Sequence, residues 1–325
     1  MIVPDYWAEA RRQYRTSAKQ VTVRRYGWSM SSQADAQLMA EARADEALQR
    51  IVAGEKLERR ERKVAYNGAA GIPIREEVLA RHGEVVITRN AYGAHCLNSP
   101  SALFADIDFT PERSAKPALF AFVALSVASV AIGISLRSWG TTFGLLFASL
   151  VAAAPIASLF ARLAVLAGGG SERMARERIA SFISENPTWN LRLYRTPAGY
   201  RVLATHRTFE AAAEEVQRFF TKVSVDPIYA RMCTNQNCFR ARLTAKPWRI
   251  GISAHMRPRP GVWPVRSESV AVRNQWIAGY EAKAAAFAAC RYIESMGSGV
   301  VHESLRSVVD LHDRESQALS GAQLA

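Results

Sequence analysis

Two long apolar runs dominate the hydropathy pattern of the chain. They cover residues 117–136 and 143–161, and neither contains a charged residue. A helix of 20 residues rises about 30 Å, close to the hydrocarbon thickness of a bilayer. The short polar segment between the runs, residues 137–142, suits a tight turn. We therefore predict a two-helix transmembrane hairpin within residues 113–170. A helical hairpin buried in a soluble core is the alternative.

Basic residues flank the two apolar runs and predict their orientation. Arg137 alone stands in the turn, and Trp139 beside it suits a membrane interface. The outer flanks carry Arg113, Lys116, Arg162, Arg173, Arg176 and Arg178. Because positive residues favour the cytoplasmic side, both termini should be cytoplasmic and the turn outside. The chain is then a multi-pass protein of the cell inner membrane.

Outside these runs, the apolar periodicity predicts a mixed α/β protein. The expected helices are 32–54, 74–83, 171–185, 209–222, 270–296 and 304–319. The expected strands are 84–88, 103–109, 191–196, 200–205 and 239–244. Residues 89–100 and 223–238 are expected to be irregular. Residues 1–30 mix basic and aromatic side chains, as in an arm that binds a membrane surface or nucleic acid, or in a merely solvated segment.

These elements predict an α+β fold in which the hairpin interrupts a cytoplasmic α/β domain. The expected segments are a basic N-terminal part with an alanine-rich helix (1–65), the first part of the α/β domain (66–112), the hairpin (113–170), the second part of the domain (171–266) and C-terminal helices (267–325).

The charge balance points to anionic partners. Lys and Arg number 42 against 29 Asp and Glu, a formal net charge of +13. Anionic lipid headgroups, nucleotides and nucleic acid all fit this charge, which does not choose between them. The chain has no Gly-rich phosphate loop, nucleophile elbow or metalloprotease motif.

Asp106 and Asp108 are the first candidates for chemistry. In a strand, residues two apart point to the same face, so both carboxylates would project side by side. Neighbouring carboxylates repel each other unless a cation lies between them, and Mg²⁺ or Mn²⁺ commonly does so. The alternative is a strand that ends in solvent and holds no metal.

The order of motifs around these residues resembles the archaeo-eukaryotic primase superfamily, which includes primase–polymerases. LFADIDF at 103–109 is followed by LRLYRTPAGYRVL at 191–203, then by VDPIY at 225–229 and FRARLTAKP at 239–247. The resemblance implies a primase-like core and metal-dependent nucleotidyl transfer. It implies catalytic metal ligands at Asp106, Asp108 and Asp226, and nucleotide-binding groups at Gly199, Arg201, Arg240, Arg242 and Lys246.

The chain departs from that family at two points. Arg201 stands where the family has a His, and the hairpin separates the first two motifs. Arg can bind phosphate but does not replace His in every role. Two functions therefore stay open: a membrane-anchored nucleotide- or nucleic-acid-binding protein with such a site, or a non-enzymatic membrane protein whose basic domain binds anionic lipid or a protein partner.

A few other polar residues carry weaker signals. Cys96, Cys233, Cys238 and Cys290 have no disulfide-framework spacing and indicate reduced thiols. Cys233 and Cys238 would either belong to a zinc site together with His255 or be ordinary thiols. His206 is expected to be structural. Asp310, His312 and Asp313 form either a polar cluster or an exposed helix face.

Overall fold

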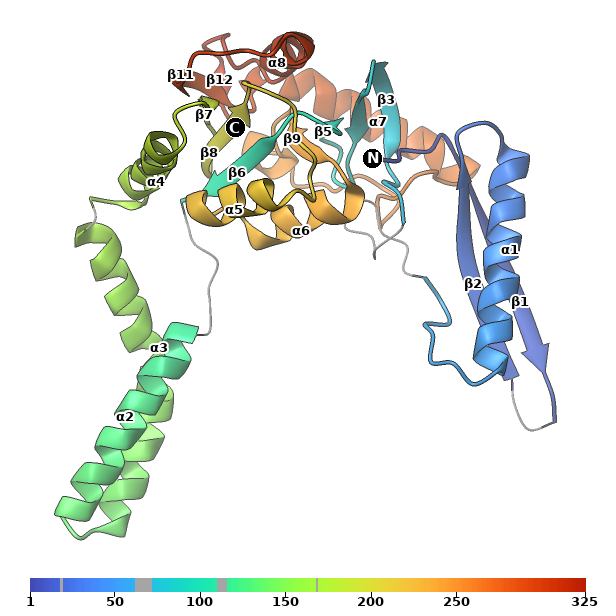
Figure 1. The fold of residues 1–325 in the computed structure, drawn as a ribbon. Helices are drawn as coiled ribbons and strands as arrows, with labels where there is room; N and C mark the ends of the chain where they lie inside the picture. Colours follow the sequence, from blue (N-terminus) through green and yellow to red (C-terminus); the bar gives the residue numbers. More distant parts are fainter. Residues whose placement is uncertain (18–19, 62–71, 110–115, 168) are drawn as a thin grey trace.

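The structure is a computed structural model that describes residues 1–17, 20–61, 72–109, 116–167 and 169–325. It is a mixed α/β protein from which two parts project: an N-terminal unit and an apolar helical hairpin (Figure 1). Arg113 and the expected segment boundaries near residues 65 and 112 lie outside the described residues.

The first sheet of the α/β core is antiparallel. Among the described residues it has four strands in the order β11-β7-β8-β6. Their bounds are Phe104–Asp108 (β6), Asn190–Arg195 (β7), Gly199–Ala204 (β8) and Arg291–Gly297 (β11). Gly199 pairs with Asp108, and a Cβ there would lie 2.0 Å from the carbonyl oxygen of Ile107. Only glycine therefore allows β8 to approach β6 this closely.

A second antiparallel sheet lies beside the first. In the described part of the chain its four strands run in the order β3-β4-β5-β9. Their bounds are Glu77–His82 (β3), Val85–Arg89 (β4), His95–Ser99 (β5) and Phe239–Arg242 (β9). The buried Tyr229 hydroxyl joins the two sheets, lying 2.9 Å from the carbonyl oxygen of Phe104 and 3.0 Å from that of Arg240. The edges of β6 and β9 therefore meet.

Helices cover these sheets and complete the core. Their bounds are Ser171–Glu185 (α4), Glu214–Val223 (α5), Pro227–Gln236 (α6), Ser267–Ala284 (α7) and Glu303–Glu315 (α8), with a short 3-10 helix at Pro247–Ile250 (η1). Strands β10 (Phe287–Ala288) and β12 (Gln323–Leu324) form a short parallel pair. Helix α5 buries Val216, Phe219, Phe220 and Val223 on one face, in the same apolar cluster as the first sheet. This i, i+3, i+4, i+7 spacing is typical of an amphipathic helix on a core.

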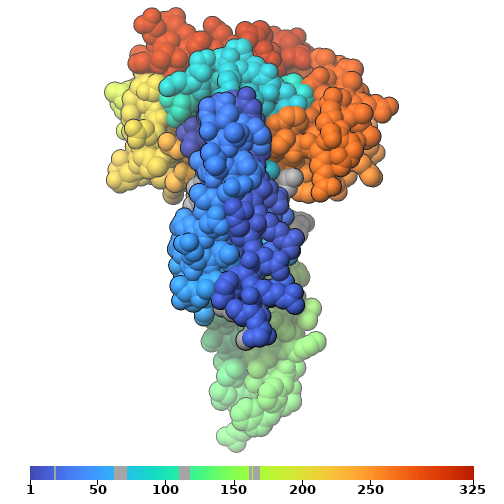
Figure 2. All heavy atoms as spheres, turned by 90° about the vertical axis from the view of Figure 1, so that its right-hand side faces the viewer, coloured from blue at the N-terminus to red at the C-terminus, as the bar shows by residue number. Residues whose placement is uncertain are grey.

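The N-terminal unit is a β-hairpin packed on a helix, and residues 1–30 are therefore not an extended arm. Strands β1 (Tyr6–Arg15) and β2 (Gln20–Ser29) pair along their whole length, and α1 (Gln33–Val52) covers one face. Buried alanines of α1 at positions 36, 40 and 44 contact Ala8 and Ala10. The unit projects from the core as a narrow column (Figure 2). A two-stranded hairpin needs another element to pack against in order to be stable. The many basic residues of this segment obscure its strand pattern in the sequence.

Several predicted elements are confirmed and others are wrong. The structure confirms the helices near 32–54, 171–185, 209–222 and 304–319 and all five predicted strands, with shifted ends. Residues predicted as a helix at 74–83 instead form β3, and the expected loop 89–100 contains β5. The irregular segment 223–238 contains α6, which Asp226 caps. The predicted helix 270–296 ends at Ala284, and its last third becomes β11 because that segment pairs with β7.

The apolar hairpin consists of α2 (Lys116–Ser135) and α3 (Trp139–Ala167). Both helices are long and apolar enough to cross a membrane, and only 11% of each apolar window is buried. The helices are therefore not the core of a soluble domain in this structure. The Ser129 and Ser149 hydroxyls lie 3.0 Å apart between the helices, and Gly133 lies against Thr142. Small residues thus allow close helix packing.

Candidate functional site

A cavity of about 550 Å³ opens where the edges of β6 and β9 meet. Its walls come from the segment after β4, from the β7–β8 turn, from α6 and from the chain that follows β9. Six of the eight sequence-predicted site residues line it: Asp106, Asp108, Asp226, Arg240, Arg242 and Lys246. These residues are up to 140 positions apart in the sequence, so the tertiary fold brings them together. Gly199 and Arg201 are not among the lining residues.

Asp106 is held by Arg201. The two guanidinium nitrogens Nε and Nη2 of Arg201 donate to the Asp106 oxygens at 2.7 and 3.1 Å. The side chain of Arg201 is 1% exposed, against 34% for Asp106. Burial alone would raise the pKa of Asp106, but the charge and hydrogen bonds of Arg201 outweigh it and hold that pKa below its ordinary value. Arg201 therefore lies behind Asp106 and orients it, and its predicted contact with a nucleotide stays a prediction.

Asp108 and Asp226 are the other two carboxylates at the cavity. Asp108 follows Asp106 at i+2 on the same face of β6, as the alternation predicted. Burial and the negative charges of Asp106 and Asp226 raise the pKa of Asp108, against the opposing effect of Lys246 and Arg249. Asp226 caps helix α6, where its Oδ1 accepts the Ile228 N–H at 2.8 Å. Asp108 and Asp226 form no salt bridge within the described residues, and both line the cavity.

Four basic residues line the cavity, and we call them its basic wall: Arg240, Arg242, Lys246 and Arg249. Arg240 binds buried Glu76 at 2.7 and 2.8 Å, which compensates its charge. Arg242, Lys246 and Arg249 form no salt bridge in the part of the chain described here. Burial and the charges of Arg242 and Arg249 lower the pKa of Lys246. Three cations thus line the cavity together with the carboxylates of Asp106, Asp108 and Asp226.

Two guanidinium N–H groups in this wall are buried without a partner. Nε of Arg242 and Nη1 of Arg249 have no hydrogen-bond acceptor in the described structure. Leaving such a donor unsatisfied costs about 1–3 kcal/mol, and more for a charged group. A ligand with anionic oxygens would satisfy both donors. Arg249 was missed in the sequence, although it continues the basic run of Arg242 and Lys246.

The carboxylates do not by themselves form a metal cage. Among the described residues, no group of three or more His, Cys, Asp or Glu side chains is arranged to hold a metal ion. Asp106 is occupied by Arg201, which leaves Asp108 and Asp226. Mg²⁺ is commonly bound by one or two carboxylates together with substrate phosphates and water. Asp108 and Asp226 fit that arrangement, whereas Asp106 as a metal ligand stays a prediction.

The weaker candidates are structural in this arrangement. Cys233 and Cys238 are buried around the end of α6, and His255 lies in a different cavity, so the three do not form a zinc site in the described residues. His206 packs on Trp189 and accepts the Asn190 N–H. His312 and Asp313 are buried rather than on an exposed face, while Asp310 is exposed.

A buried polar network stands behind Arg201. Nε2 of His312 lies 3.5 Å from Arg201 Nη1, and Nδ1 of His312 lies 3.1 Å from Asp313. Asp313 in turn accepts hydrogen bonds from Arg192 and Tyr194 at 2.6 and 2.7 Å. The Arg201–Asp106 pair is therefore fixed from the interior of the first sheet. Sequence reasoning marked the two residues of α8 but not their link to the cavity.

Comparisons of the chain with protein-family models, with curated proteins and with solved structures find no match. The resemblance to the primase superfamily thus stays a prediction, and the geometry of the cavity carries the functional argument.

Proposed function

We propose that the cavity between β6 and β9 binds a nucleotide through its phosphate groups. The unpaired buried donors of Arg242 and Arg249, next to Lys246, are the observation that carries this proposal. Guanidinium groups bind phosphate oxygens through charge-assisted hydrogen bonds. The lining also includes Tyr92, Met232 and Val262, whose apolar surfaces suit a nucleoside. A volume of about 550 Å³ is within the range of small-ligand sites.

A divalent cation would bind after or together with the nucleotide. Asp108 and Asp226 would supply carboxylate oxygens, and the phosphates would complete the coordination sphere. Metal-dependent nucleotidyl transfer would use this arrangement, with Asp106 held in place by Arg201. Nucleotide binding without metal and binding with metal are therefore separate measurements.

We also propose that the α2–α3 hairpin anchors this domain in the cell inner membrane. Its length and low burial support a crossing, and the basic residues Arg173, Arg176 and Arg178 after α3 favour a cytoplasmic position for the adjoining domain. Both termini would then be cytoplasmic, on the side where nucleotides are abundant.

Removal of the basic wall is expected to abolish most nucleotide binding. Arg242→Ala, Lys246→Ala and Arg249→Ala should each weaken ATP binding about tenfold or more, since each removes a charge-assisted contact of roughly 1.5–3 kcal/mol. The measurement is titration of the detergent-solubilised full chain with ATP in EDTA and in Mn²⁺. Arg218→Ala is the matched control, because this exposed arginine of α5 lies outside the cavity lining and pairs with Glu214. Unchanged affinity in all three cavity variants would contradict the proposal.

The pH dependence of metal-free ATP binding is expected to depend on Asp108. Because the pKa of Asp108 is raised, this carboxyl takes up a proton while the pH is still above its ordinary value near 3.8, and the cavity then becomes more positive. At pH 8, Asp108→Asn should bind ATP in EDTA about fivefold more tightly than the unmodified protein, a single-charge effect. The ratio of the two affinities should approach one as the pH falls.

This ratio cancels the titration of ATP itself, so only the protein contributes. With Mn²⁺ present the sign should reverse at pH 8, because the metal needs the ionised carboxylate. A ratio that is constant over the whole pH range in EDTA would show that Asp108 does not face the bound phosphates.

A further inference from the structure

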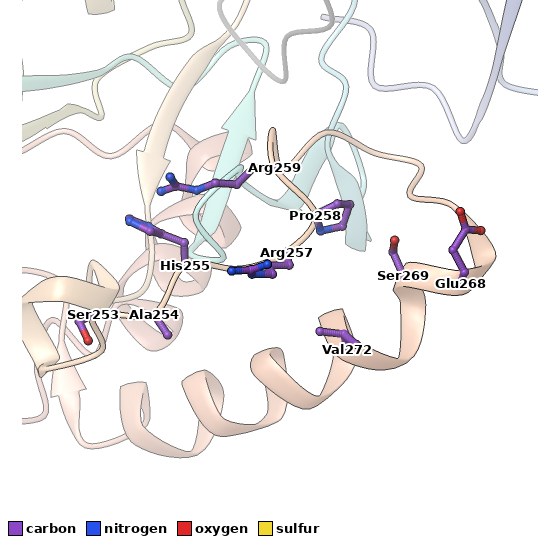
Figure 3. A pocket seen from close by; sticks show the side chains of 9 residues that line it. All are labelled: Ser253, Ala254, His255, Arg257, Pro258, Arg259, Glu268, Ser269 and Val272. Atoms are coloured by element: carbon purple, nitrogen blue, oxygen red, sulfur yellow. The ribbon is translucent and has the colours of Figure 1, made fainter.

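A second cavity opens beside the first, above helix α7. Its volume is about 810 Å³, and its lining residues come from the loop 253–259 and from the first turns of α7. Figure 3 shows His255, Arg257 and Arg259 on the loop side and Ser269 and Val272 on the helix side. We call this cavity the arginine groove.

The arginines of this groove are exposed. Within the described part of the chain, Arg257 and Arg259 form no salt bridge and no hydrogen bond. Glu268, the acidic residue at the rim, lies 3.7 Å from Arg266. Among the described residues, the groove therefore presents two positive charges without a salt-bridge partner.

A small cavity of about 70 Å³ connects the arginine groove to the nucleotide cavity. It shares Ala91 and Tyr92 with the nucleotide cavity, and Ser253, Ala254, His255 and Arg259 with the groove. The three cavities therefore adjoin one another, and we call this row of cavities the track.

An exposed tryptophan stands on this track between the basic groups. Trp248 is 54% exposed, and its ring packs on that of Tyr92 in a T-shaped arrangement at a centroid distance of 5.3 Å. The Lys246 ammonium lies 5.4 Å from the Trp248 ring. Trp276, in contrast, stacks on Tyr280 and donates to the carbonyl oxygen of Ala254, so it belongs to the wall. Trp248 therefore leaves about half of its surface open for stacking, next to the Lys246 ammonium.

We propose that this track binds single-stranded nucleic acid. The proposal rests on the proposed function, because the strand would begin at the nucleotide cavity. One base would stack on Trp248, and the following phosphates would contact Arg259 and Arg257. Cations interleaved with an exposed aromatic ring along a concave track are the arrangement that binds single strands irrespective of sequence. A bilayer surface is flat and does not enter such a concave groove.

The test uses the full chain in a neutral detergent and a fluorescein-labelled 20-nucleotide oligodeoxythymidine, followed by fluorescence anisotropy. Trp248→Ala should weaken binding about tenfold, whereas Trp248→Phe should retain most of it because a ring remains. Arg257→Ala/Arg259→Ala should lower the slope of log affinity against log salt by about 1.4, roughly 0.7 for each lost phosphate contact. Arg218→Ala/Arg306→Ala removes two exposed arginines elsewhere and should change nothing.

The outcomes separate this inference from the proposed function. One outcome is that ATP binds to the cavity while the groove variants and Trp248→Ala keep the oligonucleotide affinity of the unmodified protein. That result would refute strand binding along the track and retain the nucleotide site. If ATP does not bind at all, the proposed function fails. Vesicles of phosphatidylcholine with phosphatidylserine provide the last comparison. Loss of vesicle binding in the groove variants, with oligonucleotide binding unchanged, would assign the groove to a membrane surface and overturn the inference.

Discussion

Asp106→Asn is expected to destabilise the protein by about 3 kcal/mol, whereas Asp108→Asn, two residues along the same strand, is expected to leave its stability nearly unchanged. Asp106 compensates the charge of Arg201, whose side chain is 1% exposed. Without that carboxylate, a buried guanidinium loses its counter-ion, and removal of one partner of a buried pair costs about 3–5 kcal/mol. We expect a cost at the lower end of this range because Asp106 is 34% exposed. Asp108 has a raised pKa and no salt bridge in the described residues, so its ionised form adds no comparable stability.

Thermal unfolding of the solubilised protein measures this difference. A loss of about 3 kcal/mol should lower the midpoint by roughly 6–12 °C for a domain of this size. A double variant, Asp106→Asn/Arg201→Met, should recover part of the loss because it removes the uncompensated charge. Since the pKa of Asp106 is held below its ordinary value, the contribution of the pair is present above about pH 4 and is lost as the pH falls further. Equal midpoints for the two single variants would show that Arg201 does not need Asp106.

Ala128→Arg is expected to prevent normal membrane insertion of the α2–α3 hairpin. Ala128 is exposed near the middle of α2, next to Ser129, which faces α3. A charge at that depth of a bilayer costs about 2.5 kcal/mol or more on insertion scales. Ala42→Arg is the matched control, because Ala42 is an exposed alanine of helix α1 and should tolerate the same change. Ala44, two residues further, is fully buried against the N-terminal hairpin, so arginine there should disrupt that unit.

Cysteine labelling in intact cells reports the insertion. In a background without the native cysteines, Ser138→Cys in the turn should react with an impermeant reagent, and Ser267→Cys at the start of α7 should be protected. Ala128→Arg should abolish the labelling at position 138 and move the chain out of the membrane fraction. Labelling at position 267 with protection at 138 would reverse the proposed orientation. Normal fractionation of Ala128→Arg would favour a hairpin that does not span a membrane.

The sequence was sufficient for the elements whose signal is local. The apolar hairpin consists of two long apolar runs, and α1 has an alanine-rich helical pattern. Ser32 caps α1 by accepting the N–H of Asp35, as an N-terminal cap does. The paired carboxylates of β6 follow from strand alternation alone, and both line the cavity. Order along the chain also indicated Asp226 and the basic residues after β9, which the fold brings to the same place.

The tertiary structure decided the elements and contacts that depend on distant partners. Residues 77–82 have helical composition, yet they form β3 because β4 offers an open edge and buried Glu76, next to β3, binds Arg240 from β9. Residues 291–297 leave the predicted helix because they complete the first sheet at β7. In the same way, no sequence pattern distinguishes Asp108, whose charge is exposed, from Asp106, whose charge is paired. The partner of Asp106 is Arg201, which lies 95 positions further along the chain. Pairing energy between strands and between buried charges arises only when the chain has folded, so local composition cannot encode which partner each residue meets.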